Sequence, residues 1–297
     1  MVIINYHVPG KIVRCFATHE DGPLKLDFYP PAKEEQREDR ACVITLHGGG
    51  FMKGSREDEW SWETARELCH KGFAVANVDY RLGLKDKKIS LPRLGGLMER
   101  SINMAVEDLA WAITYLRGHA KEFDIDPRKI ILAGCSAGAI VALQLGYYLA
   151  NDALNGTTGI LSEVDYWPIA IVAYSGAVMC GPGMFRHENP IPTMLYHGLK
   201  DRIVRPGMIP CSLGKRFYGS VRLYEEFERH TGTFRMRIFP NAWHEVSMLL
   251  PRSTEEFCEF VEDALAQKDD HSLKVSLRTG IDSDEQMKSS IFGLLKK

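Results

Sequence analysis

The sequence predicts an α/β fold with a mostly parallel central sheet, helices on both faces of that sheet and antiparallel strands at its N-terminal end. Three observations lead to this prediction. Short apolar runs that suit buried strands alternate with helical segments between residues 42 and 265. Two candidate strands separated by a turn precede this region. A G-x-S-x-G pattern at residues 134–138 stands where an apolar run meets a helical segment.

Composition and charge limit the classes of partner. The 297 residues are 45% hydrophobic, which is enough for one large domain with a substantial core. A net charge of −2 provides no field that would attract nucleic acid or an anionic membrane, so we expect neither as a partner. No apolar run is long enough to cross a bilayer.

The cysteines and the N-terminus predict a cytoplasmic protein. Seven cysteines are scattered along the chain, and no two of them have C-x-x-C spacing. An odd number of cysteines, mostly within apolar runs, is typical of free buried thiols in a reducing compartment. No His, Cys or Asp cluster has the spacing of metal ligands, so we expect no metal. Residues 1–5 show no signal-peptide pattern, which favours the cytoplasm unless a leader precedes this sequence.

The N-terminal half divides into elements by these same patterns. We expect strands over residues 12–16, 24–29, 42–46 and 73–78, a helix over residues 60–71 and another from residue 101 to 116. Ile102, Val106 and Leu109 begin a 4-3-4-3 spacing that gives this second helix one apolar face. Residues 83–100 are expected to be irregular, and they form either a flap over a site or a mobile surface loop.

The C-terminal half continues the alternation. We expect a strand over residues 130–133, a helix to residue 149, strands over 169–174, 193–198 and 234–239, a helix over 218–229 and a last helix carrying residues 257–265. Residues 177–190 either line a pocket or cover the core. We assign residues 1–267 to one domain and residues 268–297 to a polar C-terminal extension that is peripheral or disordered.

Ser136 is the candidate nucleophile because of where it stands. The run Ile130–Ala133 predicts a buried strand before it, and the apolar run to Leu149 predicts a buried helix after it. A sharp strand-to-helix turn would expose the serine Oγ at a helix N-terminus, where the helix dipole favours negative charge. A G-x-S-x-G pattern alone is often only a loop, but the strand-turn-helix context favours a nucleophile.

A run of glycines marks a second part of the candidate site. His47-Gly48-Gly49-Gly50-Phe51 follows the expected strand over residues 42–46. Three glycines can be merely a flexible turn. At the C-terminal end of a buried strand they also allow several backbone N–H groups to point into one cavity, which would form an oxyanion hole. We interpret His47 as a structural histidine that hydrogen-bonds this loop, and not as a general base.

A serine nucleophile needs a base within hydrogen-bond reach, and the base needs an acid to orient it. Among ten histidines His244 is the best candidate base, because it follows a strand in a short loop well after Ser136. Asp201 is the best candidate acid, because it also follows a buried strand. A single loop Asp or His is more often solvated surface, but all these residues lie at predicted strand ends.

The motifs taken together resemble the α/β-hydrolase superfamily, and within it the HGGG-type carboxylesterases of the hormone-sensitive-lipase-like and bacterial acetylxylan and feruloyl esterase groups. The resemblance covers about residues 20–265 and rests on His47–Phe51, Asp79–Leu82, Asp108, Asp126-Pro127, Gly134–Gly138, His197–Asp201 and His244. It implies an α/β-hydrolase fold in which Ser136 is the nucleophile, His244 the base and Asp201 its orienting acid. It also implies an oxyanion hole made by the N–H groups of Gly49, Gly50 and Ala137.

The expected activity is therefore that of a serine carboxylic-ester hydrolase that forms an acyl-enzyme. The resemblance implies short acyl groups, with acetylated or carbohydrate-linked esters as a family-level expectation. We expect a small-molecule ester as the partner and no metal or organic cofactor. The sequence leaves open a homodimer, an amidase of the arylformamidase-like kind, and a binding protein on a hydrolase scaffold.

Overall fold

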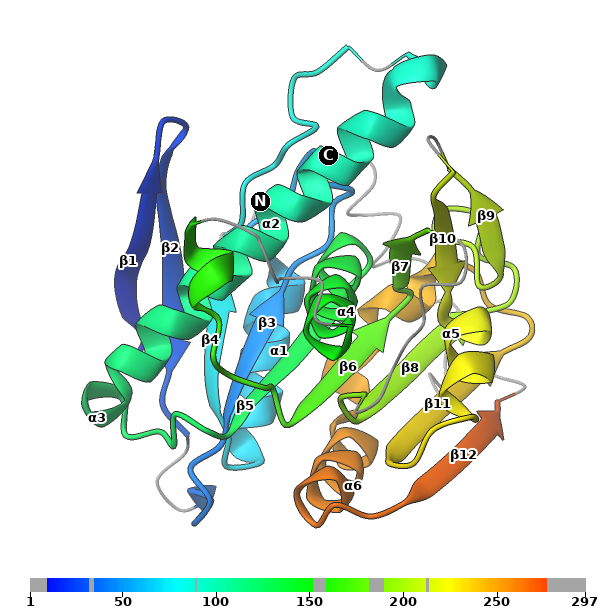
Figure 1. The fold of residues 1–297 in the computed structure, drawn as a ribbon. Coiled ribbons are helices and arrows are strands. Elements are labelled where there is room, and N and C mark those ends of the chain that lie inside the picture. Colours follow the sequence, from blue (N-terminus) through cyan, green and yellow to red (C-terminus); the bar gives the residue numbers. More distant parts are fainter. Residues whose placement is uncertain are drawn as a thin grey trace, which may run out of the picture.

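The computed structural model describes residues 10–31, 35–88, 90–151, 159–181, 190–211 and 214–276. In this part of the chain nine strands form one sheet (Figure 1). In spatial order they are β1 (Ile12–His19), β2 (Gly22–Tyr29), β4 (Ala74–Val78), β3 (Cys42–Leu46), β5 (Ile130–Cys135), β6 (Ala170–Tyr174), β8 (Thr193–Gly198), β11 (Thr233–Phe239) and β12 (Asp270–Val275). The β2 strand is antiparallel to both of its neighbours, and all other neighbours are parallel. The predicted fold class is confirmed.

The helices and a small second sheet complete the described elements. The helices are α1 (Glu59–His70), α2 (Leu91–Gly118), α3 (Ala120–Phe123), α4 (Ala137–Ala150), α5 (Ser220–Phe227) and α6 (Thr254–Leu265), with 3-10 turns η2 (Gly159–Glu163), η3 (His244–Met248) and η4 (Leu250–Arg252). The second sheet has the antiparallel order β7 (Ala177–Cys180), β10 (Arg216–Gly219) and β9 (Met208–Pro210). It was not predicted, because its strands are short and lack a regular apolar alternation.

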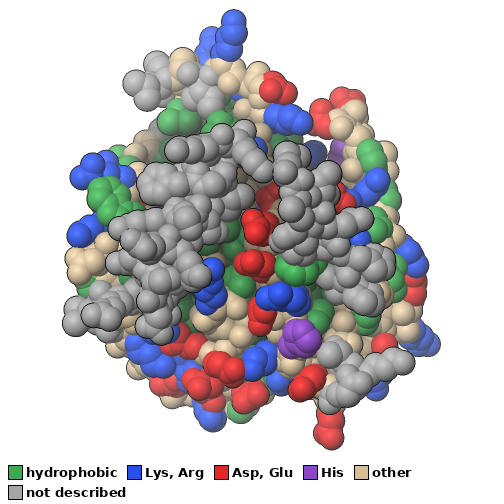
Figure 2. Space-filling view, turned by 180° about the vertical axis from the view of Figure 1, so that it is seen from behind, with side chains coloured by type: hydrophobic (Ala, Val, Ile, Leu, Met, Phe, Trp, Pro, Cys, Tyr) green, Lys and Arg blue, Asp and Glu red, His purple; other side chains and the backbone are tan. Residues whose placement is uncertain are grey.

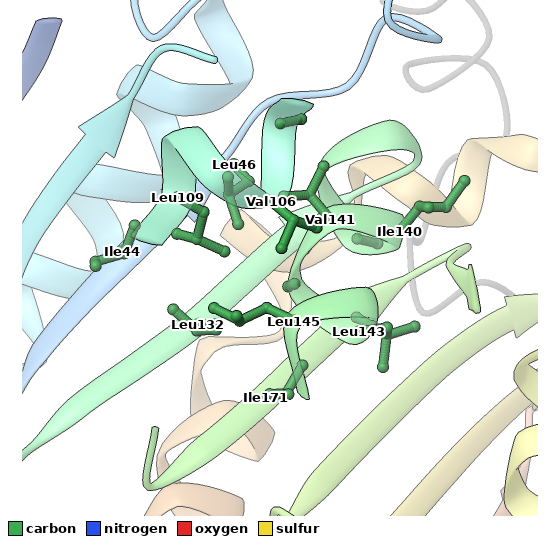
Figure 3. Close-up of a cluster of buried hydrophobic side chains, with 14 of the residues drawn as sticks. Ile44, Leu46, Val106, Leu109, Leu132, Ile140, Val141, Leu143, Leu145 and Ile171 are labelled. Carbon is green, nitrogen blue, oxygen red and sulfur yellow. The ribbon is translucent and has the colours of Figure 1, made fainter. Parts of the chain in front are cut away.

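Side chains alternate across the main sheet and create a core on each face. On one face Ile44 of β3 and Leu132 of β5 pack with Val106 of α2 and Val141 of α4 (Figure 3). On the other face the residues just before these two on their strands, Val43 on β3 and Ile131 on β5, pack with α1 and α6. Figure 1 shows α2 and α4 in front of the sheet and α1 behind it. Strands buried on both faces explain the continuous apolar runs of the sequence.

The structure corrects the prediction that residues 83–100 are irregular. Helix α2 begins at Leu91, with Pro92 in its first turn, and continues without a break through Gly95 and Gly96. Proline is tolerated at this position, because the first N–H groups of a helix have no partner within the helix. The connection from β4 to α2 is thus shorter than predicted. The predicted helix over residues 218–229 is also corrected, because its first residues belong to β10 and α5 ends at Phe227.

The segment after residue 267 contributes to the sheet. We expected residues 268–297 to be peripheral or disordered. Residues 270–275 form β12, which pairs in parallel with β11 at the edge of the sheet, and this is a peripheral position. The sheet therefore extends beyond the domain border set at residue 267. Two ranges lie outside the described residues. They are residues 277–297 of the extension and residues 182–189, and the second range falls in the segment over residues 177–190 that was expected to line a pocket or cover the core.

The surface shows charges of both signs. Figure 2, seen from behind the view of Figure 1, shows acidic and basic side chains intermingled, with no extended area of one sign among the described residues on that face. None of the described helices combines the length and the apolar character needed to cross a membrane.

Candidate active site

Ser136 lies at the turn between β5 and α4. Its backbone has φ 51° and ψ −115°, a combination that a non-glycine residue rarely adopts. Its N–H donates to the Tyr174 carbonyl at 2.9 Å, and its carbonyl accepts from the Ile140 N–H at 3.0 Å. Hydrogen bonds to β6 and to the first turn of α4 thus hold the strained turn in place.

The two glycines of the motif are required by close contact. A Cβ atom on Gly134 would lie 2.5 Å from the carbonyl carbon of Gly138, and a Cβ atom on Gly138 would lie 2.1 Å from the Leu46 carbonyl oxygen. Both distances are far below van der Waals contact. The spacing G-x-S-x-G is therefore what lets α4 start directly against β3 and β5, which leaves the serine at the tip of the turn.

The structure brings His244 and Asp201 to Ser136. The Nε2 atom of His244 lies 2.8 Å from Ser136 Oγ, and its Nδ1 atom lies 2.7 Å from Asp201 Oδ2. An ionised carboxylate can only accept, so Nδ1 carries the proton and Nε2 is free to accept the serine proton. His244 starts η3 just after β11, and Asp201 follows β8. All three residues therefore lie at the carboxyl edge of the parallel strands, as predicted.

The surroundings of Asp201 keep it ionised. Its Oδ1 atom accepts the N–H groups of Ile203 at 2.8 Å and Val204 at 3.0 Å. Burial alone would raise the pKa of the Asp201 carboxyl, but the imidazoles of His197 and His244 outweigh burial and hold that pKa well below its usual range. A permanent negative charge therefore lies behind His244.

His197 supports Asp201, a role that the sequence analysis did not assign to it. It is fully buried at the end of β8, where its Nε2 atom lies 2.8 Å from the Val204 carbonyl oxygen and 3.5 Å from Asp201 Oδ2. The carbonyl can only accept, so Nε2 donates. Its Nδ1 atom lies 2.7 Å from the Ser220 hydroxyl. His197 thereby fastens the turn that carries Asp201. Its position four residues before the acid was the available signal.

The glycine-rich loop is held in a tight conformation. Gly49 has φ 112°, and a Cβ atom there would lie 1.9 Å from the Lys53 carbonyl oxygen. Its own carbonyl accepts the N–H groups of Met52 at 3.1 Å and Lys53 at 3.2 Å. Among the described residues no acceptor pairs with the N–H groups of Gly49, Gly50 or Ala137. These donors are therefore available to a ligand.

His47 has the structural role expected of it. It is buried, its Nδ1 atom lies 2.7 Å from the Gly48 carbonyl oxygen, and its ring stacks on Tyr80 with 4.3 Å between ring centroids. The Tyr80 hydroxyl donates to the His47 carbonyl at 2.7 Å. Burial lowers the pKa of His47, so a neutral imidazole supports the loop.

Arg56 anchors the far end of this loop. Its guanidinium binds the buried carboxylate of Asp27 at 2.8 Å and that of Asp79 at 2.7 Å, and its backbone N–H reaches Asp79 at 3.2 Å. Asp79 comes directly after β4, so the anchor ties the loop after β3 to the neighbouring strand. It accounts for part of the Asp79–Leu82 motif seen in the sequence.

Ser136 opens into an apolar cavity of about 160 Å³. Gly50 and Ala137 belong to its wall, next to the serine. Its described apolar side chains include those of Phe51, Met98, Ile140, Ile203, Val204 and Phe217. Met98 comes from the part of α2 that was expected to be a loop, and Phe217 from the unpredicted second sheet. Within the described residues no group of three or more His, Cys, Asp or Glu side chains is arranged to hold a metal.

Solved structures with the same architecture are known. The apo form of esterase 2 from Thermogutta terrifontis superimposes with a TM-score of 0.61 at 19% identity, covering 89% of this chain and 98% of that one. The butyrate-bound form of the same protein gives a TM-score of 0.61, also at 19% identity, over 84% of this chain and 94% of that one. At this identity the likeness establishes the fold alone.

Sequence comparison identifies related proteins. Lipase 2 of Moraxella sp. (strain TA144) is 30% identical over 137 residues, which are 43% of this chain and 27% of that protein. An acetyl esterase of Salmonella choleraesuis (strain SC-B67) is 24% identical over 204 residues, which are 68% of this chain and 52% of that protein. The matches span between about a quarter and about a half of these curated relatives. A sequence model of the BD-FAE family matches residues 26–178, just over half of the chain, and includes the glycine-rich loop and Ser136. The chain therefore belongs to the BD-FAE family and has the α/β-hydrolase fold.

Proposed function

We propose that this chain hydrolyses short-acyl carboxylic esters through a serine nucleophile and an acyl-enzyme. The observation that carries the proposal is the continuous relay from Asp201 through His244 to Ser136, with distances of 2.7 and 2.8 Å, at the wall of an apolar cavity. The relatives named as lipases and acetyl esterases support the same class of bond.

In the first half of the reaction Ser136 Oγ attacks the ester carbonyl carbon while its proton moves to His244 Nε2. The carbonyl oxygen becomes an oxyanion beside the N–H groups of Gly49, Gly50 and Ala137. Each such donor is worth about 3 kcal/mol of transition-state stabilisation. The Asp201 carboxylate stays ionised and stabilises the imidazolium. The carbon–oxygen bond to the alcohol then breaks, and His244 gives its proton to the departing alcohol oxygen.

The second half reverses these roles with water. His244, now neutral, takes a proton from a water molecule, which attacks the carbonyl carbon of the acyl-enzyme. The same N–H groups stabilise the second oxyanion. The bond to Ser136 Oγ breaks, and Oγ recovers the proton from His244. The acid product leaves, and every group has returned to its starting state.

The size of the cavity limits the group that can occupy it. The cavity of about 160 Å³ beside Ser136 is close to the volume of an apolar cavity, roughly 150 Å³, that holds one benzene molecule in another protein. An acyl chain of up to about six carbons has a similar volume. We therefore expect ester turnover to fall steeply beyond that length.

The test compares para-nitrophenyl esters from acetate to laurate with the wild type and with Ser136→Ala. Turnover of the short esters that disappears in the variant, with an unchanged circular dichroism spectrum, supports the proposal. Substantial turnover by Ser136→Ala would refute it. A second comparison uses phenyl formate and formanilide, which share the formyl group. An esterase should prefer phenyl formate, and an arylformamidase-like enzyme should prefer formanilide. Failure of Ser136 to react with a phosphonate probe would instead favour a binding protein.

A further inference from the structure

Among the described side chains that line the cavity beside Ser136, a single one is charged. Among the described residues that line it, Arg205 is the one ionised group, and Ser136 is the one other polar side chain. The rest of the wall is apolar side chains together with small residues of the glycine loop and of α4. A ligand in this cavity therefore meets one cation against an apolar background.

The Arg205 guanidinium has no structural partner among the described residues. Within the described residues it forms no ion pair and no hydrogen bond, and its side chain is exposed. Three other arginines differ: Arg56, Arg81 and Arg235 each bind carboxylates and lie mostly buried. The charge of Arg205 is thus available to a ligand.

The backbone around Arg205 is nevertheless fixed. The Val204 N–H donates to Asp201 Oδ1 at 3.0 Å, and the Pro206 carbonyl accepts the Val221 N–H at 2.9 Å. One side of Arg205 is therefore tied to the carboxylate behind His244, and the other side is tied to α5. The guanidinium can move at the end of its side chain, but the residue stays at the wall of the cavity that Ser136 also lines.

Other unpaired cations lie on the same loops. Lys53 of the glycine-rich loop and Lys200 next to Asp201 are exposed and unpaired among the described residues. Arg202 stacks on Trp243 at 4.9 Å from the ring centroid. The nearby acid Glu245 accepts the Trp243 N–H at 2.9 Å. Although the chain has a net charge of −2, Lys53, Lys200 and Arg205 form no ion pair among the described residues.

We propose that this cavity takes an ester that carries a carboxylate at its non-reacting end, and that Arg205 binds this carboxylate. The inference rests on the proposed function and adds a substrate class, of which the hemiester of a short dicarboxylic acid is the simplest member. A guanidinium matches a carboxylate with two parallel N–H donors, and the apolar wall reduces the competition from water. The short cavity places the carboxylate within a few bonds of the scissile carbonyl.

The first experiment compares two esters with five acyl carbons at neutral pH, where the free carboxyl is ionised. Monoethyl glutarate carries the terminal charge, and ethyl pentanoate does not. Release of acid is followed in a pH-stat, because neither ester has a chromophore. The wild type should show kcat/KM about two- to fivefold higher for monoethyl glutarate, the range expected of an ion pair with an exposed arginine. This preference should shrink as salt is added.

Three variants locate the source of that preference. Arg205→Gln should bring the ratio of the two kcat/KM values to about one, and Arg205→Lys should retain part of it, because lysine has the charge without the two-pronged geometry. Arg202→Gln is the matched control, since it removes the same charge from the same loop outside the cavity, and it should keep the wild-type ratio. Each ratio is internal to one protein sample, so partial misfolding does not change it.

A second pair of esters distinguishes where the carboxylate lies. The enzyme is given para-acetoxybenzoate and its neutral methyl ester, in which the charge is on the alcohol part. A preference for the anion that is lost in Arg205→Gln would support the proposal with the carboxylate on the alcohol side. Hydrolysis of the neutral esters with no preference for either anion would overturn the inference and leave the proposed function standing. A preference that survives Arg205→Gln would also overturn it. Absence of turnover on every ester would overturn both.

Discussion

His197 and Asp201 approach one another across a single turn, with 3.5 Å between His197 Nε2 and Asp201 Oδ2. Both side chains are buried. Val204, three residues after Asp201, donates its N–H to Asp201, and its carbonyl accepts from His197. The carboxylate behind His244 is thus held from two directions. The precision of this arrangement matters because a misplacement of about 1 Å can cost about two orders of magnitude in rate.

The first prediction concerns His197. The substitution His197→Leu leaves the Val204 carbonyl without its donor and loosens Asp201, so kcat should fall by about ten- to hundredfold. The KM for a short neutral ester should change much less. The substitution His197→Gln retains an N–H donor and should recover part of kcat. Steady-state kinetics on a short para-nitrophenyl ester would measure these changes. Equal kcat values for the His197→Leu and His197→Gln variants would contradict a positioning role for His197.

A second prediction concerns the charge of Asp201. The substitution Asp201→Asn should lower kcat by about four orders of magnitude, as in serine protease triads, because the amide can hold His244 in the wrong tautomer. A nearly unchanged kcat would show that Asp201 does not orient His244.

The same carboxyl makes stability depend on pH. The folded-state pKa of Asp201 lies below its unfolded value, so its ionised form contributes stability that is fully present above about pH 4 and is lost as pH falls toward the folded pKa. The difference in the free energy of unfolding between the wild type and Asp201→Asn should therefore be largest at neutral pH and smaller at about pH 3. Urea unfolding at both pH values tests this sign.

A third prediction separates two glycines that look alike in the sequence. The substitution Gly138→Ala puts a Cβ atom 2.1 Å from the Leu46 carbonyl oxygen, so it should destabilise the fold by about 2 kcal/mol or more. The control Gly96→Ala lies inside α2 with no atom within 4 Å of the new methyl group, so it should stabilise by about 0.5–1 kcal/mol. Thermal unfolding would detect the opposite signs. A shift in the same direction for both would contradict the close approach of α4 to β3.

A fourth prediction concerns Arg56. Among the described residues, the substitution Arg56→Gln leaves the buried Asp27 carboxylate with Lys11 at 3.2 Å as its one cationic partner, and it should cost about 3 kcal/mol. Turnover by the folded fraction should also fall, because the glycine-rich loop loses its anchor. The control Arg66→Gln removes an exposed arginine that pairs with its neighbour Glu67, and it should cost less than about 1 kcal/mol. Comparable losses of stability would contradict the anchor.

Much of the architecture could be predicted because the buried strands are recognisable as apolar runs in the sequence. The runs Cys42–Leu46 and Ile130–Cys135 are apolar without interruption, since both faces of the sheet are covered. Parallel strands end at one edge, so residues that follow such runs tend to meet. This is why Ser136, Asp201 and His244 could be nominated together. The amphipathic spacing of α2 from residue 101 onward was readable for the same reason.

Other features depended on contacts that no single segment displays. The start of α2 was missed, because Pro92 and Gly95 read as helix breakers, whereas Pro92 occupies the first turn where it is tolerated. The strand β12 was missed, because an edge strand buries little and its sequence is polar. The second sheet was missed, because its strands are short and pair across gaps in the sequence.

The sequence by itself determined the fold class and the identity of the residues that meet at the carboxyl edge of the sheet, because periodicity and apolar runs report how each segment is buried. Only the tertiary structure decided that His197 braces Asp201, that Arg56 anchors the glycine-rich loop, and that Arg205 lines the cavity beside Ser136. The positions of Arg56 and Arg205 depend on contacts between segments that are far apart in the chain, and the His197–Asp201 contact depends on how the turn after β8 folds.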